Sequence, residues 1–141
     1  MKTFKKMMLA LTILLTAGAA YSATASSHVP GKDDVINTYL NAVVHGKLAG
    51  VEDVIDDDAQ FNLIRGNSVN RLNKGQILAA LQSSANIDTD CQCTKTVVQD
   101  SDEISTMKVE MKYADFTRVD VITAQHAGNG WKITKVDTSF K

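Results

Sequence analysis

The sequence predicts an α+β domain in which about three N-terminal helices pack on one face of an antiparallel sheet. Two observations predict it: hydrophobic residues recur mainly with the period of a helix between Asp33 and Leu81, and they alternate with polar residues beyond Ser84. Helices followed by a run of strands joined by short turns are typical of the α+β class. The chain has 141 residues, of which 44% are hydrophobic and 22% charged, so one domain is expected.

The first 25 residues have the pattern of a secretory signal peptide. Lys2, Lys5 and Lys6 provide a positive N-terminal region, residues 7–17 are almost continuously apolar, and small residues follow as far as Ala25. A transmembrane anchor is the competing interpretation, but it needs about 20 apolar residues, more than this stretch offers. We therefore expect cleavage near Ala25 and export, either to the periplasm or as a secreted protein.

Cleavage at that point leaves residues 26–32 as a flexible N-terminus and residues 33–141 as the folded domain. No later segment is apolar for long enough to span a membrane, so no membrane contact is expected once the signal is removed. The formal net charge is −1 and the chain has no basic block, which argues against DNA or RNA as a partner.

The residues from Asp33 onward have the spacing of an amphipathic helix that ends near Gly46. Asp33 and Asp34 suit the positive N-terminal end of this helix, and Gly46 suits the left-handed residue that stops it. A short second helix is predicted next, with the acidic run 56–58 in a solvated loop after it. The buried face of the first helix is expected to carry Val35, Ile36, Tyr39, Leu40 and Val43.

A short strand over 61–65, a turn at 65–68 and a returning strand over 69–72 follow. Asn73 is a suitable N-cap for a third helix with Ile77, Leu78 and Leu81 on its buried face. Beyond Ser84, alternation predicts strands over 93–99, 106–113, 116–126 and 131–138, with turns at 100–103 and 128–130.

The order of these elements resembles the nuclear transport factor 2-like superfamily over residues 33–140. The motifs that carry the resemblance are the leading helix with Tyr39 and Leu40, the segment Asp57-Asp58-Ala59-Gln60-Phe61, the helix over 75–81 and the hairpin Gly128-Asn129-Gly130-Trp131-Lys132-Ile133. The chain is most similar to the small exported bacterial domains labelled putative lumazine-binding, where a Phe-x-x-x-Asp strand, here residues 116–120, precedes such a hairpin. The resemblance implies a strongly curved sheet folded around the first helix, giving a cone-shaped domain with a cavity open at one end.

Relatives of this shape include enzymes, such as ketosteroid isomerases and polyketide cyclases, and domains that only bind or dimerise. In the isomerases a carboxylate lies on the strand after the Asp-Asp-Ala loop, where this chain has Asn62, Leu63 and Ile64. Tyr39 resembles the placement of a tyrosine that such enzymes use as a donor, but it also lies on the apolar stripe of the first helix. Since a donor without a base does not make an enzyme, we expect binding without turnover.

The expected ligand is a small apolar or aromatic molecule held inside the cone, with no cofactor and no metal. Small-molecule sites are mainly apolar and aromatic, and methionines adapt to the shape of a ligand. The competing interpretation is that the same side chains fill a solid core. The residues predicted to line the site are Tyr39, Val43, Phe61, Leu63, Met107, Val109, Met111 and Tyr113.

Two other functions stay open at this point. One is an enzyme of the isomerase or cyclase type, whose acid–base pair the sequence does not identify. The other is a pure dimerisation domain that forms a homodimer through the sheet. An ionisable pair deep in the cone would favour the enzyme, whereas an apolar, closed cone would favour a structural role.

Cys91-Gln92-Cys93 is the most unusual local feature of the chain. Two cysteines with one residue between them do not make a structural zinc site. In a straight strand, residues i and i+2 are about 6.6 Å apart, near the upper limit for a disulfide. Because the polar stretch before Cys91 can bend, we expect Cys91 and Cys93 to form a disulfide that acts as a local clamp.

Overall fold

The computed structural model describes residues 29–128 and 130–141. The predicted signal peptide, the next three residues and Asn129 of the last turn lie outside the described residues. Within this part of the chain, no helix has the length and apolar character needed to cross a membrane.

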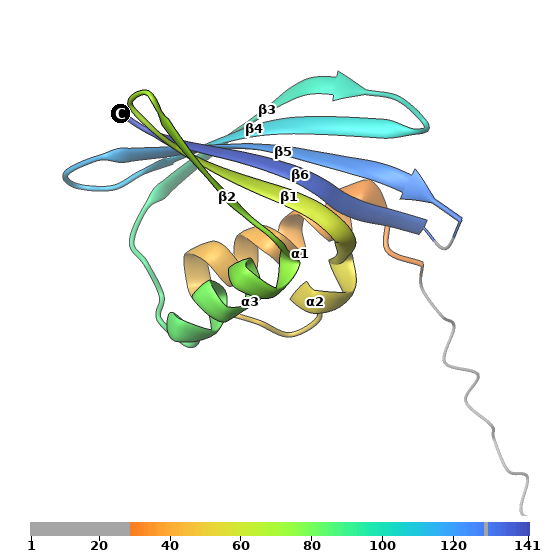
Figure 1. The fold of residues 1–141 in the computed structure, drawn as a ribbon, viewed down its shortest axis with the longest axis horizontal. Coiled ribbons are helices and arrows are strands. Elements are labelled where there is room, and N and C mark those ends of the chain that lie inside the picture. The colour runs from red at the N-terminus through yellow and green to blue at the C-terminus, as the bar shows by residue number, and fades with distance from the viewer. Residues whose placement is uncertain (1–28, 129) are drawn as a thin grey trace, which may run out of the picture.

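A six-stranded curved sheet lies over the helices, which all cover the same face (Figure 1). This arrangement confirms the predicted α+β class. The helices are α1 (Lys32–His45), α2 (Val51–Val54) and α3 (Lys74–Ser83). The strands are β1 (Ile55–Arg65), β2 (Ser68–Leu72), β3 (Gln92–Asp100), β4 (Ile104–Lys112), β5 (Thr117–Ala127) and β6 (Gly130–Phe140).

The sheet is mixed rather than antiparallel throughout. Its strand order is β2-β1-β6-β5-β4-β3, and every neighbouring pair is antiparallel except β1 and β6, which are parallel. The expectation of a purely antiparallel sheet was therefore wrong at this pair. The four antiparallel contacts join strands that follow one another in the chain, whereas α3 and four other strands separate β1 from β6.

The acidic run of Asp56, Asp57 and Asp58 lies in the first part of β1 and not in a loop, which corrects the sequence prediction. Ile55 pairs with Ile133 and Gln60 pairs with Lys135, so β1 places more residues than β6 between these two pairs and bulges there. Asp57 and Asp58 point to solvent along the bulge. A bulge lets charged side chains stay hydrated while the strand continues.

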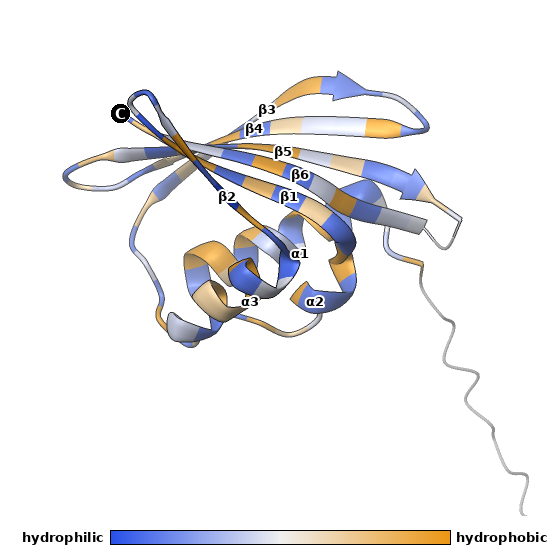
Figure 2. Ribbon diagram, viewed as in Figure 1, coloured by the Kyte–Doolittle hydropathy of each residue, from blue (hydrophilic) through white to orange (hydrophobic). Residues whose placement is uncertain are grey.

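Helix α1 fills the centre of the concave face. It packs on β5 and β6, and α3 packs on β1. Figure 2 shows hydrophilic and hydrophobic bands alternating along β5 and β6, as the period of two predicts. The side chains buried from α1 are Val35, Ile36, Tyr39, Leu40, Ala42 and Val44.

Gly46 ends α1 and contacts the loop that follows α3. Its φ of 62° lies in the left-handed region, and its N–H donates to the carbonyl of Ala42 at 3.2 Å. The backbone N–H of Asn86 donates to the carbonyl of Gly46 at 2.9 Å. A Cβ at position 46 would lie 2.6 Å from that nitrogen and 2.7 Å from the carbonyl oxygen of Ser84. No other residue fits there without moving backbone.

We expect Gly46→Ala to lower the free energy of unfolding by about 3 kcal/mol or more, because it adds a backbone clash to the cost of a left-handed alanine. Gly66→Ala is the matched control, since Gly66 has a φ of 57° but nothing within 4 Å of the new Cβ. That variant should lose only about 1 kcal/mol. Urea unfolding of both variants measures the difference, and equal losses would mean that the clash at position 46 relaxes freely.

Candidate functional site

A buried ion pair occupies the concave face of β5. Arg118 Nε donates to Asp120 Oδ1 at 2.9 Å, and Arg118 Nη2 donates to Asp120 Oδ2 at 3.0 Å. The hydroxyl of Thr138, which faces Asp120 across the β5–β6 ladder, donates to Oδ1 at 2.8 Å. Asp120 has no exposed surface. Its carboxylate therefore receives three hydrogen bonds, two of them from a cation.

Tyr39 of α1 lies beside this pair, and its hydroxyl is buried without a hydrogen-bond partner. Its ring centroid is 6.1 Å from that of Phe61. Burial, followed by the charge of Asp120, raises the pKa of Tyr39 well above its ordinary value. For Arg118, burial lowers the pKa, but Asp120 more than offsets this and the pKa is raised. The guanidinium of Arg118 is therefore charged and Tyr39 is a neutral donor.

This cluster can hold a polar group but does not form an acid–base pair. A general base must reach the proton that it removes, and the carboxylate of Asp120 is already occupied by Arg118 and Thr138. Asn62 is one of the three residues after Phe61 in the segment where the isomerases have a carboxylate, and its side-chain amide donates to Asp137 at 2.8 Å. The interior thus contains an ionisable pair, and that pair is a salt bridge.

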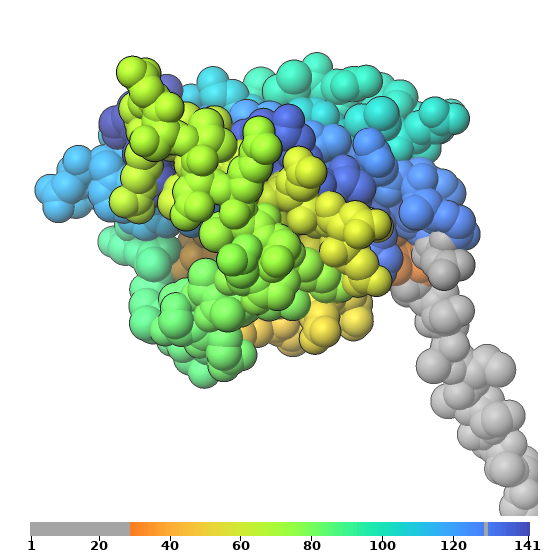
Figure 3. All heavy atoms as spheres, in the orientation of Figure 1, coloured from red at the N-terminus to blue at the C-terminus, as the bar shows by residue number. Residues whose placement is uncertain are grey.

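An open hollow of about 250 Å³ lies between β1, α3 and the ends of β5 and β6. Figure 3 shows the β1–β2 hairpin and α3, in yellow-green and green, side by side on one face of the molecule. The apolar residues that line this hollow are Phe61, Leu63, Leu72, Ile77, Ala80 and Phe140. The polar residues that line it are Asn62, Arg65, Arg118 and Thr138. Arg118 thus joins the buried ion pair to a surface that solvent reaches.

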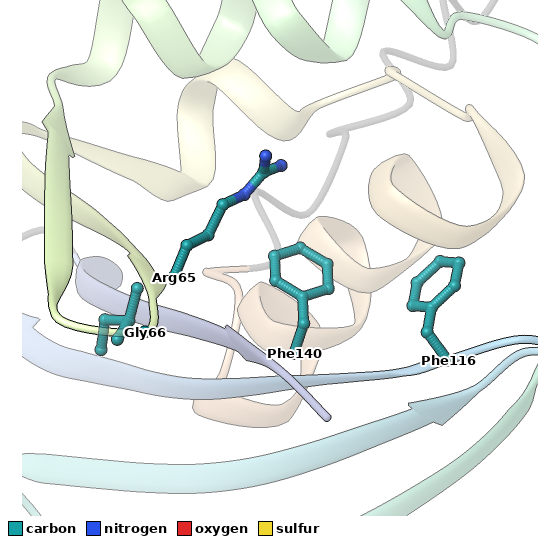
Figure 4. A pocket seen from close by; sticks show the side chains of 5 residues that line it. Arg65, Gly66, Phe116 and Phe140 are labelled. Carbon is teal, nitrogen blue, oxygen red and sulfur yellow. The ribbon is translucent and has the colours of Figure 1, made fainter.

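A second, shallower hollow of about 490 Å³ adjoins the first and shares Arg65 and Phe140 with it. It is also lined by Ile64, Gly66 and Phe116. In Figure 4 the rings of Phe116 and Phe140 stand side by side and extend to the same side as the side chain of Arg65.

The structure brings only part of the predicted site together. Phe61 and Leu63 line the first hollow. Tyr39, Val109 and Met111 have no exposed surface and belong to the core, and Val43 and Met107 pack partly buried against it. Tyr113 lies at another hollow, beside Cys91 and Lys112.

Sequence reasoning missed four residues of the site. They are Arg118 and Asp120 of the ion pair, and Phe116 and Phe140, which form the aromatic rim of the two hollows. One signal was available for Asp120: it shares strand parity with Ile122 and Ala124, so a carboxylate fell on a face that is otherwise apolar. Phe116 and Phe140 lie just before β5 and at the end of β6, where alternation gives little guidance.

Cys91 and Cys93 are free thiols whose sulfur atoms lie 3.5 Å apart. Cys91 is half-buried before β3 and Cys93 is exposed on it. Burial, together with the neighbouring Cys91, raises the pKa of the Cys93 thiol to about 11, so this thiol is protonated near neutral pH. The disulfide stays a prediction. Within residues 29–128 and 130–141, no group of three or more His, Cys, Asp or Glu side chains is placed to hold a metal ion.

Comparison with known proteins matches residues 28–137 to the profile of a family described as putative lumazine-binding. No functionally curated protein matches the chain. A protein of unknown function from Silicibacter pomeroyi, described as similar to nuclear transport factor 2, has a similar structure with a TM-score of 0.65 and 17% identity. The match covers 77% of this chain and 92% of that one.

Two further solved structures have the same fold. An uncharacterised protein of the same description from Methylobacillus flagellatus matches with a TM-score of 0.60 and 17% identity over 77% of this chain and 88% of that one. A domain from Thiobacillus denitrificans, described as a putative calcium/calmodulin-dependent protein kinase type II association domain, matches with a TM-score of 0.56 and 13% identity over 78% and 94%. At these identities the likeness shows the fold alone.

We expect Asp120→Ala to lower the free energy of unfolding by about 3 kcal/mol, because it leaves the guanidinium of Arg118 largely buried and unpaired. The double variant Arg118→Met with Asp120→Leu removes both charges and should lose less. Asp115→Ala, at an exposed carboxylate near the same strand, is the control and should change little. Urea unfolding tests this, and a double variant that loses more than Asp120→Ala would contradict it.

We expect oxidised glutathione to convert Cys91 and Cys93 into an intramolecular disulfide. Each sulfur loses a proton, and the two electrons pass to glutathione disulfide, which leaves as two glutathione thiols. The sulfur atoms must approach from 3.5 Å to about 2.05 Å, which requires a small movement of the segment without regular structure that precedes β3. Mass spectrometry should find a chain lighter by two hydrogens, with Cys93→Ser as the variant that cannot react in this way. Two thiols that stay titratable after this treatment would contradict the prediction.

Proposed function

Because this chain belongs to the family described as putative lumazine-binding, within the nuclear transport factor 2-like superfamily, we propose that it is an exported domain that binds a small molecule without converting it. The proposed site is the hollow between β1, α3 and the ends of β5 and β6. The observation that supports it is an open, mostly apolar surface with a fixed cation in its wall. Apolar linings with a few oriented polar groups are typical of ligand sites.

The proposal places the ligand at the rim of the concave face and not under α1. Val109 and Met111, which the sequence suggested as lining, are fully buried in the core, so a ligand there would have to displace packed side chains. The first hollow is smaller than the roughly 300–1,000 Å³ of sites for drug-sized molecules. A small ligand, or one enclosed only in part, suits it.

The absence of turnover follows from the chemistry of the interior. The raised pKa of Tyr39 keeps its hydroxyl a donor, and the carboxylate of Asp120 stays engaged with Arg118. An isomerase or cyclase would need a second group to remove a proton. Export of the domain rests on the lysines and apolar stretch of the first 25 residues.

Two neighbouring alanines of α3 allow a direct test of the site. Ala79 and Ala80 are both exposed, but only Ala80 lines the hollow. Calorimetric titration with lumazine, other flat aromatic compounds and sterol-like compounds should find at least one ligand for the wild type. Ala80→Trp should weaken its binding by about tenfold or more because the indole fills the hollow, and Ala79→Trp should bind as the wild type does.

Three results would overturn this proposal. Equal affinity in Ala80→Trp and the wild type would place the ligand elsewhere. Conversion of a bound compound would favour the isomerase or cyclase alternative. No binding by any compound, together with an unliganded homodimer in native mass spectrometry of protein from its own host, would favour the dimerisation domain.

A further inference from the structure

We infer that the site selects a small aromatic carboxylate, whose acid group pairs with Arg65 while its ring lies against Phe116 and Phe140. The inference rests on the proposed function and adds the chemical class of the ligand. It is carried by the charge of the lining and by the ring geometry of the rim.

The two adjoining hollows are lined by two arginines and by no aspartate or glutamate. Arg118 donates two hydrogen bonds, from Nε and Nη2, to the buried carboxylate of Asp120. Arg65, which lines both hollows, has no carboxylate or hydrogen-bond partner in residues 29–128 and 130–141. Its guanidinium lies over the ring of Phe140, whose centroid is 5.5 Å from Cζ. The uncompensated charge at the rim is therefore positive.

The rim presents aromatic faces beside that charge. Tyr113 and Phe116 are stacked with centroids 4.7 Å apart, and Phe116 and Phe140 are tilted with centroids 6.0 Å apart. Phe116 is 46% exposed and Phe140 is 40% exposed. Rings that are half open to solvent bury further area when a flat ligand packs on them, and offset or tilted arrangements at these spacings are favourable.

The geometry of Arg65 allows both contacts at once. A carboxylate binds a guanidinium in the plane of its N–H groups, often with two parallel hydrogen bonds, whereas a ring contacts the face of the same group. Arg65 already presents its guanidinium to Phe140, so an incoming acid can take the free N–H groups without ending that contact. In Figure 4 the side chain of Arg65 extends toward the ring of Phe140.

Other ligand classes fit less well. A cation would lie near two arginines, and the carboxylate of Asp120 that could neutralise it has no exposed surface. A phosphate prefers several converging donors, and no lysine lines either hollow. A neutral ring would leave Arg65 paired only with water and Phe140.

The test compares 2-naphthoate with 2-naphthalenemethanol, which has the same rings but no charge. Calorimetric titration of the wild type should give about tenfold tighter binding of the acid, because a charge-assisted pair is gained. Added salt should weaken binding of the acid and leave the alcohol unaffected. Arg65→Gln should remove the preference and keep the affinity for the alcohol. Arg71→Gln, at an exposed arginine of β2 outside both hollows, should keep the preference.

The outcomes separate this inference from the proposed function. Equal binding of acid and alcohol to the wild type, with both weakened by Ala80→Trp, would overturn the aromatic acid and support the hollow as the site. A preference for the acid that survives in Arg65→Gln would overturn the role of Arg65. Failure of both naphthalene probes to bind would overturn the inference, while binding of another compound that Ala80→Trp abolishes would leave the proposed function standing.

Discussion

The burial of Asp120 is the constraint on which the concave face depends. A carboxylate without exposed surface is tolerated only when its charge is paired and its oxygens accept hydrogen bonds. Arg118 meets this need because extended backbone places residues 118 and 120 on the same side of β5. Thr138 meets it only in the observed β5–β6 register. Slipping that register by one residue would turn Thr138 to the other face and leave Asp120 with one partner fewer.

Local signals predicted the elements that are formed locally. Gly46 stops α1 in a left-handed conformation, and Asn73 caps α3 by accepting a hydrogen bond from the backbone N–H of Gln76. Alternation located β3 to β6 to within a few residues. The parallel pairing of β1 with β6 was not predictable in this way, since it joins distant parts of the chain. The bulge that carries the acidic run belongs to the same long-range pairing.

The candidate site was less predictable than the fold for a physical reason. A period of two tells which face of a strand a side chain occupies, but it does not tell whether the space above that face is filled. Val109 and Met111 do face the concave side, and the core that includes Tyr39 and Ile36 of α1 closes over them. Leu63 faces the same side nearer the end of its strand, where the first hollow stays open. The packing of α1 on the sheet decides that Val109 and Met111 are buried in the core while Leu63 lines an open hollow.

Arg118 lies at the boundary between the buried core and the solvent-accessible hollow of the concave face. On one side it neutralises Asp120, which the fold could not otherwise bury, and on the other it forms part of the wall of the hollow. Because both bonds to Asp120 hold its guanidinium in place, Arg118 would lose less side-chain entropy on binding a ligand than a mobile arginine would. The ion pair that neutralises the buried carboxylate of Asp120 thus also places a polar group, the guanidinium of Arg118, in the wall of a mostly apolar hollow. Arg65 differs from Arg118 in being exposed, and its charge has no carboxylate partner in the described part of the chain, which is why the proposed selection of an acid is assigned to Arg65.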